Sequence, residues 1–350
     1  MTHHRSAFSL NRPGALIAAL PAVLGFVPAD SLVVASIEDG HLGAVMRADL
    51  SDALTGDHDH IAHILAAAEP DGVIAVVVSE KGAGCAECND DYRDLGAALG
   101  AALGDRSIEL CALYIVDRVQ AGGRWHCADG CGRRGVIDDP AVSPLAVEAV
   151  VGGRRLYGSR ADLKQVIAAE DGSEALVERI REAADASRAA QREDPDGHTR
   201  TGVLAAIQAA QRLDAGRQPT DAVLAGLAHH LTDSATRDAL YALAVGFHAA
   251  RAEALWTLLA RRLPQPWRLE ALVLLAFSAY ARGDGPLAGL ALAEALECDG
   301  THRMARMLDE ALLSGMRPAQ IRELALSGYR VADRVGVELP PREGLGRRAG

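Results

Sequence analysis

The sequence has few aromatic residues, no surplus of positive charge and no long apolar run. Aromatic residues make up 4% of the 350 residues, so we expect closely packed helices rather than broad β-sandwiches. The formal net charge of −11 argues against nucleic-acid binding and against a polybasic membrane surface, because both depend on Lys and Arg. No segment reaches about 18 uninterrupted apolar residues, so the sequence predicts no transmembrane helix.

Common catalytic and nucleotide-binding signatures are also missing. The sequence has no G-x-x-x-x-G-K-[ST] motif, and Gly82-Ala83-Gly84 lacks the rest of a dinucleotide fingerprint. No G-x-S-x-G motif surrounds Ser31 or any other serine. Six cysteines are too few for a disulfide scaffold at this length. The sequence therefore offers no signature that names a reaction.

The N-terminal part, residues 10–158, predicts an α/β domain with a mixed sheet, because strand and helix patterns alternate along it. The β-branched runs Leu32–Ile37 and Val73–Val78 are the strongest strand signals. Between Leu32–Ile37 and a returning strand over His41–Leu50, Asp39–Gly40 favours a type I′ hairpin turn. Further helices are expected over Pro13–Leu20 (with a continuation to Leu24), His58–Glu69, Asp90–Leu103 and Ser143–Val151, further strands over Ile108–Val116 and Arg124–Cys127, and loops over Lys81–Asn89 and Ala128–Pro140.

The remaining chain has a helical pattern. Residues 159–200 are expected to form a helical linker region, and residues 201–330 an all-α domain that includes helices over Gly202–Leu213 and Thr236–Ala249. One helix pair around Gly283–Asp284 has the spacing of a tetratricopeptide repeat. An ordinary Ala-rich helical bundle is the alternative. Residues 1–10 and 338–350 are expected to be disordered.

Two polar features of the first domain suggest a site. Arg47 and Asp49 are two residues apart on the second strand, so they share a face, either as an ion pair or as a pair that contacts a ligand. Asp30 and Ser31 precede the first strand, where a turn or a helix cap is the simpler interpretation. We therefore expect a ligand site, if this domain has one, near these four residues.

The cysteines form two close pairs on expected loops. Cys85 and Cys88 are three residues apart, and Cys127 and Cys131 are four apart. Four thiolates from two such pairs can bind one tetrahedral zinc ion, so zinc is a candidate cofactor. A redox-active disulfide or unliganded thiols are the alternatives. The histidines His229, His230 and His248 are expected to be surface or packing residues.

Several stretches together resemble a known family. They are LNRPGALIAALPAVLGFVPADSLVV and MRADL near the N-terminus, RWHCADGCGRRG and VVGGRRLYGSRADL in the middle, and ALWTLLARRLPQPWRLEALVLLAFSAYARGDGPLAGLALAEALECDG in the C-terminal half. On these residues the chain resembles an uncharacterised actinobacterial family described only as a domain of unknown function. The resemblance implies a cytoplasmic protein and implies that the cysteine loop after Trp125 is a family feature. It implies no activity.

Two hypotheses for function follow. The first is a non-enzymatic intracellular interaction or regulatory protein, whose tetratricopeptide-like helices offer a groove to a protein partner. The second is an enzyme or small-ligand-binding protein with a site near Arg47, Asp49 and the cysteine loop. Neither hypothesis involves nucleic acid or membrane.

Overall fold

The computed structural model describes residues 12–56, 58–66, 69–151, 154–170 and 173–339. The expectations for residues 1–10 and 340–350 therefore lie outside the described residues. The chain divides into two units, Met1–Leu163 and Lys164–Gly350, each of which is described by itself. The division lies within the short helix α6, Arg160–Gln165.

The first unit contains a mixed sheet, as the alternating patterns predict. Its strand order is β2-β1-β3-β4-β5-β6, and β3 and β4 are parallel neighbours while the other neighbouring pairs are antiparallel. Asp39 and Gly40 have φ values of 52° and 72°, as a type I′ turn between β1 and β2 requires. The strands are β1 Ser31–Glu38, β2 His41–Asp49, β3 Gly72–Val78, β4 Leu110–Val116, β5 Arg124–Cys127 and β6 Arg134–Val136.

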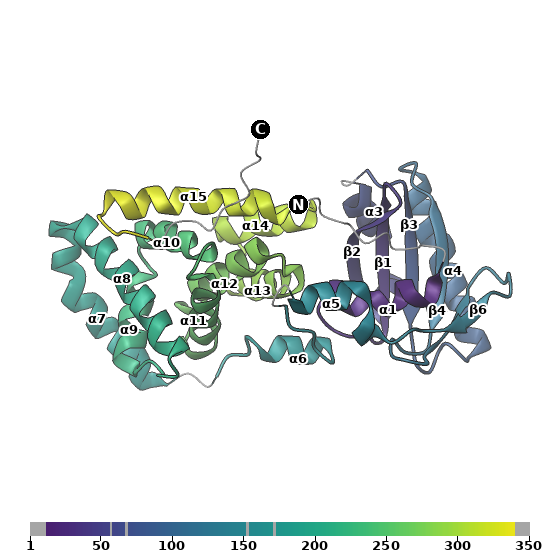
Figure 1. Ribbon diagram of the computed structural model, residues 1–350, viewed down its shortest axis with the longest axis horizontal. Helices are drawn as coiled ribbons and strands as arrows, with labels where there is room; N and C mark the ends of the chain where they lie inside the picture. The colour runs from purple at the N-terminus through teal and green to yellow at the C-terminus, as the bar shows by residue number, and fades with distance from the viewer. Residues whose placement is uncertain (1–11, 57, 67–68, 152–153, 171–172, 340–350) are drawn as a thin grey trace. The chain divides into compact units, whose positions relative to one another are not determined.

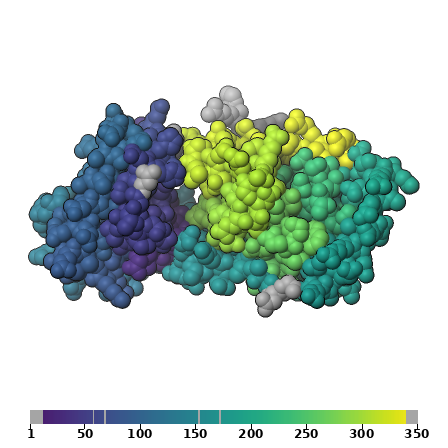
Figure 2. Space-filling view, turned by 180° about the vertical axis from the view of Figure 1, so that it is seen from behind, coloured from purple at the N-terminus to yellow at the C-terminus, as the bar shows by residue number. Residues whose placement is uncertain are grey.

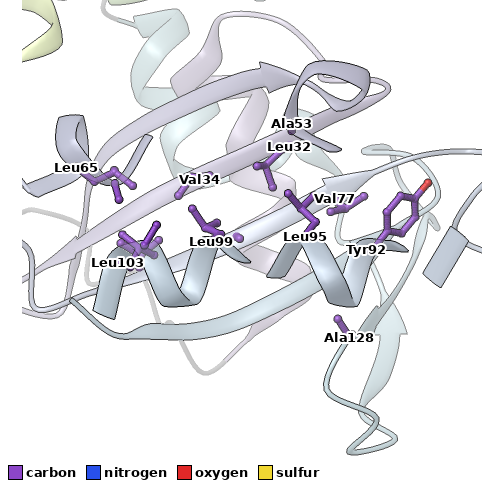
Figure 3. Packing of buried hydrophobic residues seen from close by; sticks show 14 of the residues in the cluster. Leu32, Val34, Ala53, Leu65, Val77, Tyr92, Leu95, Leu99, Leu103 and Ala128 are labelled. Carbon is purple, nitrogen blue, oxygen red and sulfur yellow. The ribbon is translucent and has the colours of Figure 1, made fainter. Parts of the chain in front are cut away.

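Helices cover both faces of this sheet. On one face, leucines of α4 pack on Leu32 and Val34 of β1 and on Val77 of β3 (Figure 3). On the other face, α1 crosses the strands beside α5 (Figure 1), and Val33 and Val76 are buried there. The helices are α1 Pro13–Leu24, α2 Leu50–Thr55, α3 His58–Ala66, α4 Ala86–Gly104, the 3-10 turn η1 Pro140–Val142 and α5 Pro144–Val151.

The second unit is helical throughout its described elements, and Figure 2 shows one face of its surface in teal to yellow. No described helix is long and apolar enough to span a bilayer. The elements are α7 Glu174–Glu193, α8 Pro195–Asp214, α9 Asp221–His230, α10 Ser234–Leu240, the 3-10 turn η2 Tyr241–Ala244, α11 Ala249–Arg262, α12 Arg268–Arg282, α13 Gly285–Cys298, α14 Arg303–Leu313 and α15 Pro318–Arg334.

The helix pair α12–α13 turns at the expected residues. Gly283 ends α12 with φ 91°, and the Asp284 carboxylate accepts a hydrogen bond of 3.1 Å from the Leu287 N–H at the start of α13. Ala288, the residue after Leu287 in α13, is completely buried. Small residues at such positions allow two helices to approach closely, which explains why α12 and α13 pack extensively.

Arg268 is a buried arginine in this unit, and hydrogen bonds hold its guanidinium in place. The side chain of Arg268 is 8% exposed and donates from Nε to the Ala260 carbonyl oxygen and from Nη2 to the Ile167 carbonyl oxygen, both at 2.7 Å. Its Nη1 lies 3.1 Å from the Glu294 carboxylate. The guanidinium therefore joins α11, α12, α13 and the segment before α7.

Four of the elements expected from the sequence differ from the structure in their bounds or in their type of secondary structure. The expected helix over Thr236–Ala249 is two helical segments, because the chain leaves the helix after Ala244 and Gly246 has φ 79°. The helix expected from Gly202 begins at Pro195, because Asp194 caps it by accepting from the Gly197 N–H. The helix expected from Asp90 begins at Ala86, and the expected loop 128–140 contains β6.

Candidate functional site

A cavity of about 870 Å³ opens beside the end of β4 in the first unit. One wall is the segment Glu80–Arg93, which comprises the loop after β3 and the first turns of α4. The other wall is the β5–β6 hairpin, residues 124–136, and Ile115 of β4 lies between the two. The carboxyl ends of parallel strands and the N-terminus of the helix that follows are common positions for ligands in α/β proteins.

Strand alternation places polar side chains on the cavity wall. Arg124 and His126 are two apart on β5, so they share a face. In the register of β5 and β6, His126 is opposite Arg134 and Arg124 is opposite Val136. All four residues line the cavity, which makes one face of this hairpin basic.

Positive charge predominates around the cavity. Four arginines line it, together with the acidic residues Glu80 and Asp117. Arg93 pairs with Asp90, whereas within the described part of the chain the other three guanidiniums form no ion pair; these are Arg124, Arg133 and Arg134. Unpaired guanidiniums bind carboxylates and phosphates through directed hydrogen bonds. The wall is therefore suited to an anionic ligand.

His126 is held as a neutral imidazole within this basic wall. Its Nε2 lies 3.0 Å from Oδ1 of Asn89 in the first turns of α4, and it donates to that oxygen. Burial, and secondly the positive charge of Arg93, lower the pKa of His126 below its ordinary value. Its Nδ1 is then left as an acceptor.

The turn between β5 and β6 brings three potential metal ligands together. Ligand atoms of Cys127, Asp129 and Cys131 all lie within 4.8 Å of one another. Gly130 and Gly132 have φ values of 74° and 78°, which reverse the chain and return Cys131 towards Cys127. Burial, and then the hydrogen bond with Cys131, raise the pKa of Cys127 to about 11. Cys127 also lines the cavity, so this group borders it.

Cys85 and Cys88 occupy a different place. Cys85 is the N-cap of α4 and Cys88 lies in its first turn, so the expectation that both are on a loop is wrong. Neither belongs to the Cys127–Asp129–Cys131 group, so the structure does not bring the four predicted zinc ligands together. Their neighbours Gly84, Ala86 and Asn89 line the cavity.

The predicted pair on β2 forms an ion pair. Arg47 Nη2 lies 2.6 Å from the Asp49 carboxylate, and Arg47 Nε donates to the Ser31 hydroxyl at 2.8 Å. Ser31 is opposite both Asp49 and Val78 in register, so this group lies at the sheet edge where β3 ends. Asp30 has φ 42°, and its carbonyl oxygen accepts from the Leu50 N–H. None of these four lines the cavity, and their ligand-binding role stays a prediction.

Comparison with known proteins assigns the chain to a family. A family model described as a domain of unknown function, DUF4192, matches residues 13–319. The chain belongs to the DUF4192 family. The DUF4192 match includes every residue of the cavity and of both cysteine pairs. No curated protein matches the chain, and no solved structure matches it.

The helical part of this DUF4192 chain contains a histidine cluster that the sequence analysis missed. His198 of α8 and His229 and His230 of α9 have ring centroids 4.6–5.6 Å apart. His229 forms a hydrogen bond with the Ser187 hydroxyl, whereas within the described residues Nε2 of His198 and Nδ1 of His230 are buried without a partner. Adjacent histidines were visible in the sequence, but His198 preceded the expected start of its helix.

Proposed function

We propose that the first unit binds a small anion with phosphate or carboxylate groups in the cavity between α4 and the β5–β6 hairpin. The observation that carries the proposal is the set of three unpaired guanidiniums on one cavity of about 870 Å³. Cavities of about 300–1,000 Å³ are the usual size for small-molecule sites. The function is therefore that of a ligand-binding or catalytic protein rather than a purely helical adaptor.

The position of the cavity adds electrostatic support. The N-terminus of α4, a helix of 19 residues, begins in the cavity wall, and a helix N-terminus favours negative charge nearby. His126 adds a neutral acceptor at Nδ1, which suits a ligand that also has a hydroxyl or amine donor. Asp117 accepts from the backbone N–H groups of Arg118 and Arg124, so its charge is partly satisfied within the β4–β5 turn.

Calorimetric titration with pyrophosphate tests this proposal. Arg124→Ala and Arg134→Ala should each weaken binding by about tenfold or more, because a charge-assisted hydrogen bond contributes roughly 1.5–3 kcal/mol. Arg155→Ala is the matched control, since Arg155 is exposed and does not line the cavity. Equal affinities for wild type and both cavity variants would contradict the proposal, as would no binding by the wild-type chain.

We also infer that Cys127, Asp129 and Cys131 hold one zinc ion. The support is the convergence of their ligand atoms and the donor set itself, because thiolate and carboxylate are common zinc ligands and three protein ligands leave one position open. Elemental analysis of protein purified without added metal should give about one equivalent of zinc, and Cys131→Ser should lower it. Cys111→Ser, which changes an exposed thiol outside the group, should not.

A second candidate function is that the second unit binds a protein partner. This hypothesis includes a tetratricopeptide-like arrangement of α12–α13 and a cytoplasmic location. The supporting observation is exposed apolar surface, including Phe247 at 60% and Leu204 at 50%. A hollow between α8 and α9 has a volume of only about 270 Å³. The larger cavity of the first unit therefore supports the small-ligand hypothesis better.

A further inference from the structure

We propose that Cys85 and Cys88 are a redox-active dithiol that reduces a small-molecule disulfide by thiol–disulfide exchange. The two residues have the C-x-x-C spacing, and both are free and partly exposed. Because both residues are partly exposed, a small molecule can reach the sulfurs. Because they are also partly buried, it can approach from fewer directions. A dithiol with this spacing after a strand, at the start of a helix, is the arrangement that exchange chemistry favours.

The position of the two thiols at the start of α4 shifts their pKa values in opposite directions. Cys85 is the N-cap of α4, and its Sγ accepts a hydrogen bond of 3.5 Å from the Cys88 N–H. That bond, and then the bond from the Cys88 thiol, lower the pKa of Cys85. The hydrogen bond to Cys85, and then burial, raise the pKa of Cys88. Cys85 is therefore the attacking thiolate, and Cys88 is the thiol that resolves the intermediate.

The N-cap hydrogen bond also places the Cys85 sulfur beside Cys88, because Cys85 Sγ lies 3.5 Å from the backbone nitrogen of Cys88. Gly82 supports this placement, because a Cβ there would lie 1.9 Å from the hydroxyl oxygen of the buried Tyr92. The loop that leads into Cys85 is therefore packed directly on α4.

The reaction balances without any further group in the protein. The Cys85 thiolate attacks one sulfur of the substrate R–S–S–R, the substrate S–S bond breaks, and one thiolate leaves and takes up a proton. Cys88 loses its proton and attacks the Cys85 sulfur, which releases the second thiol. Two electrons pass from the dithiol to the substrate, leaving a Cys85–Cys88 disulfide and two thiols. An external dithiol reductant regenerates the protein.

Oxidation of the full chain with glutathione disulfide tests the proposal. Peptide mapping of the wild-type chain should show a Cys85–Cys88 disulfide and release of two thiols per disulfide formed. Cys88→Ser should accumulate a mixed disulfide with glutathione on Cys85, because the resolving thiol is absent. Cys111→Ser removes an exposed cysteine outside this pair and should behave as the wild type.

A second measurement needs no variant. Under limiting iodoacetamide at neutral pH, Cys85 of the wild-type chain should be alkylated several times faster than Cys111, although Cys111 is more exposed. Absence of the Cys85–Cys88 disulfide after treatment with glutathione disulfide would overturn the proposal. Faster alkylation of Cys111 than of Cys85 would overturn it as well.

Discussion

Acid should destabilise the helical unit through its histidine cluster. Burial, and then the charges of His198 and His229, lower the pKa of His230 to about 4 from its ordinary value of 6.5. Burial, and then His198, also lower the pKa of His229. Because protons bind the unfolded chain more readily than the folded one, stability is complete above about pH 6.5 and is lost as the pH falls towards 4.

The size of the loss follows from the shift of His230. A fall from 6.5 to about 4 would remove about 2 kcal/mol of the free energy of unfolding between about pH 7 and about pH 5. His230 is partly exposed, so screening by solvent reduces this to about 1 kcal/mol. Asp233, which faces the cluster, raises the pKa of His230 slightly. Burial raises the pKa of Asp233, but its hydrogen bonds to Thr236 and Thr199 lower it further, to below its ordinary value of 3.8, so Asp233 titrates below this window.

Urea unfolding at the two pH values, followed by tryptophan fluorescence, measures the loss. The variant His230→Asn should lose less stability than the wild type between about pH 7 and about pH 5, by about 1 kcal/mol. His63→Asn is the control, because it removes an exposed histidine outside the cluster. Parallel losses in wild type and His230→Asn would refute the reasoning that burial holds His230 neutral.

Three packing predictions concern the same unit. Gly328→Ala should lower the free energy of unfolding by about 1–3 kcal/mol, since a Cβ there would lie 2.6 Å from the Asp238 carbonyl oxygen. Gly226→Ala should raise it by about 0.5–1 kcal/mol, because a Cβ there would meet nothing within 4 Å. Equal melting temperatures for the two variants would contradict this prediction. Ala288→Leu should cost about 1–3 kcal/mol in chemical denaturation, because the position is fully buried, and no change would mean that α13 does not pack closely there. Arg268→Met should lower the free energy of unfolding by about 2–4 kcal/mol, because it leaves buried carbonyl oxygens without donors. Arg303→Met, which replaces an exposed arginine, is the control in calorimetric unfolding. A smaller loss from Arg268→Met than from Arg303→Met would contradict the prediction.

The sheet could be predicted because its signals are local. Runs such as Val73–Val78 are β-branched, and Asp39–Gly40 has the residues that its turn requires. The start of α4 was missed for a local reason as well. Its N-cap is Cys85, which is not one of the residues that usually cap helices. The strand β6 was missed because three residues with a central Gly135 carry almost no strand signal.

The cavity could not be predicted, because its walls come from segments about thirty residues apart that only the strand order brings together. The sequence did contain a part of the signal. Arg124 and His126 alternate on an expected strand, and Arg133 and Arg134 follow within one loop. The ion pair between Arg47 and Asp49 was among the expected arrangements, and the structure contains it. However, two opposite charges that lie close together on one strand neutralise each other. Charges of one sign without partners are the better indication of a ligand site.

The two cysteine pairs have similar spacing but opposite electrostatic surroundings, and this difference separates their chemistry. Cys85 faces the N–H groups at the start of a helix, so negative charge on its sulfur is stabilised without any metal. Burial, the hydrogen bond with Cys131 and the Asp129 carboxylate all raise the pKa of the Cys127 thiol, so its thiolate forms more readily when a metal cation is bound. Zinc bound at the second pair should therefore leave the first pair free to react with a disulfide. For this reason, metal content and oxidation of the same protein report on two sites rather than on one four-cysteine centre.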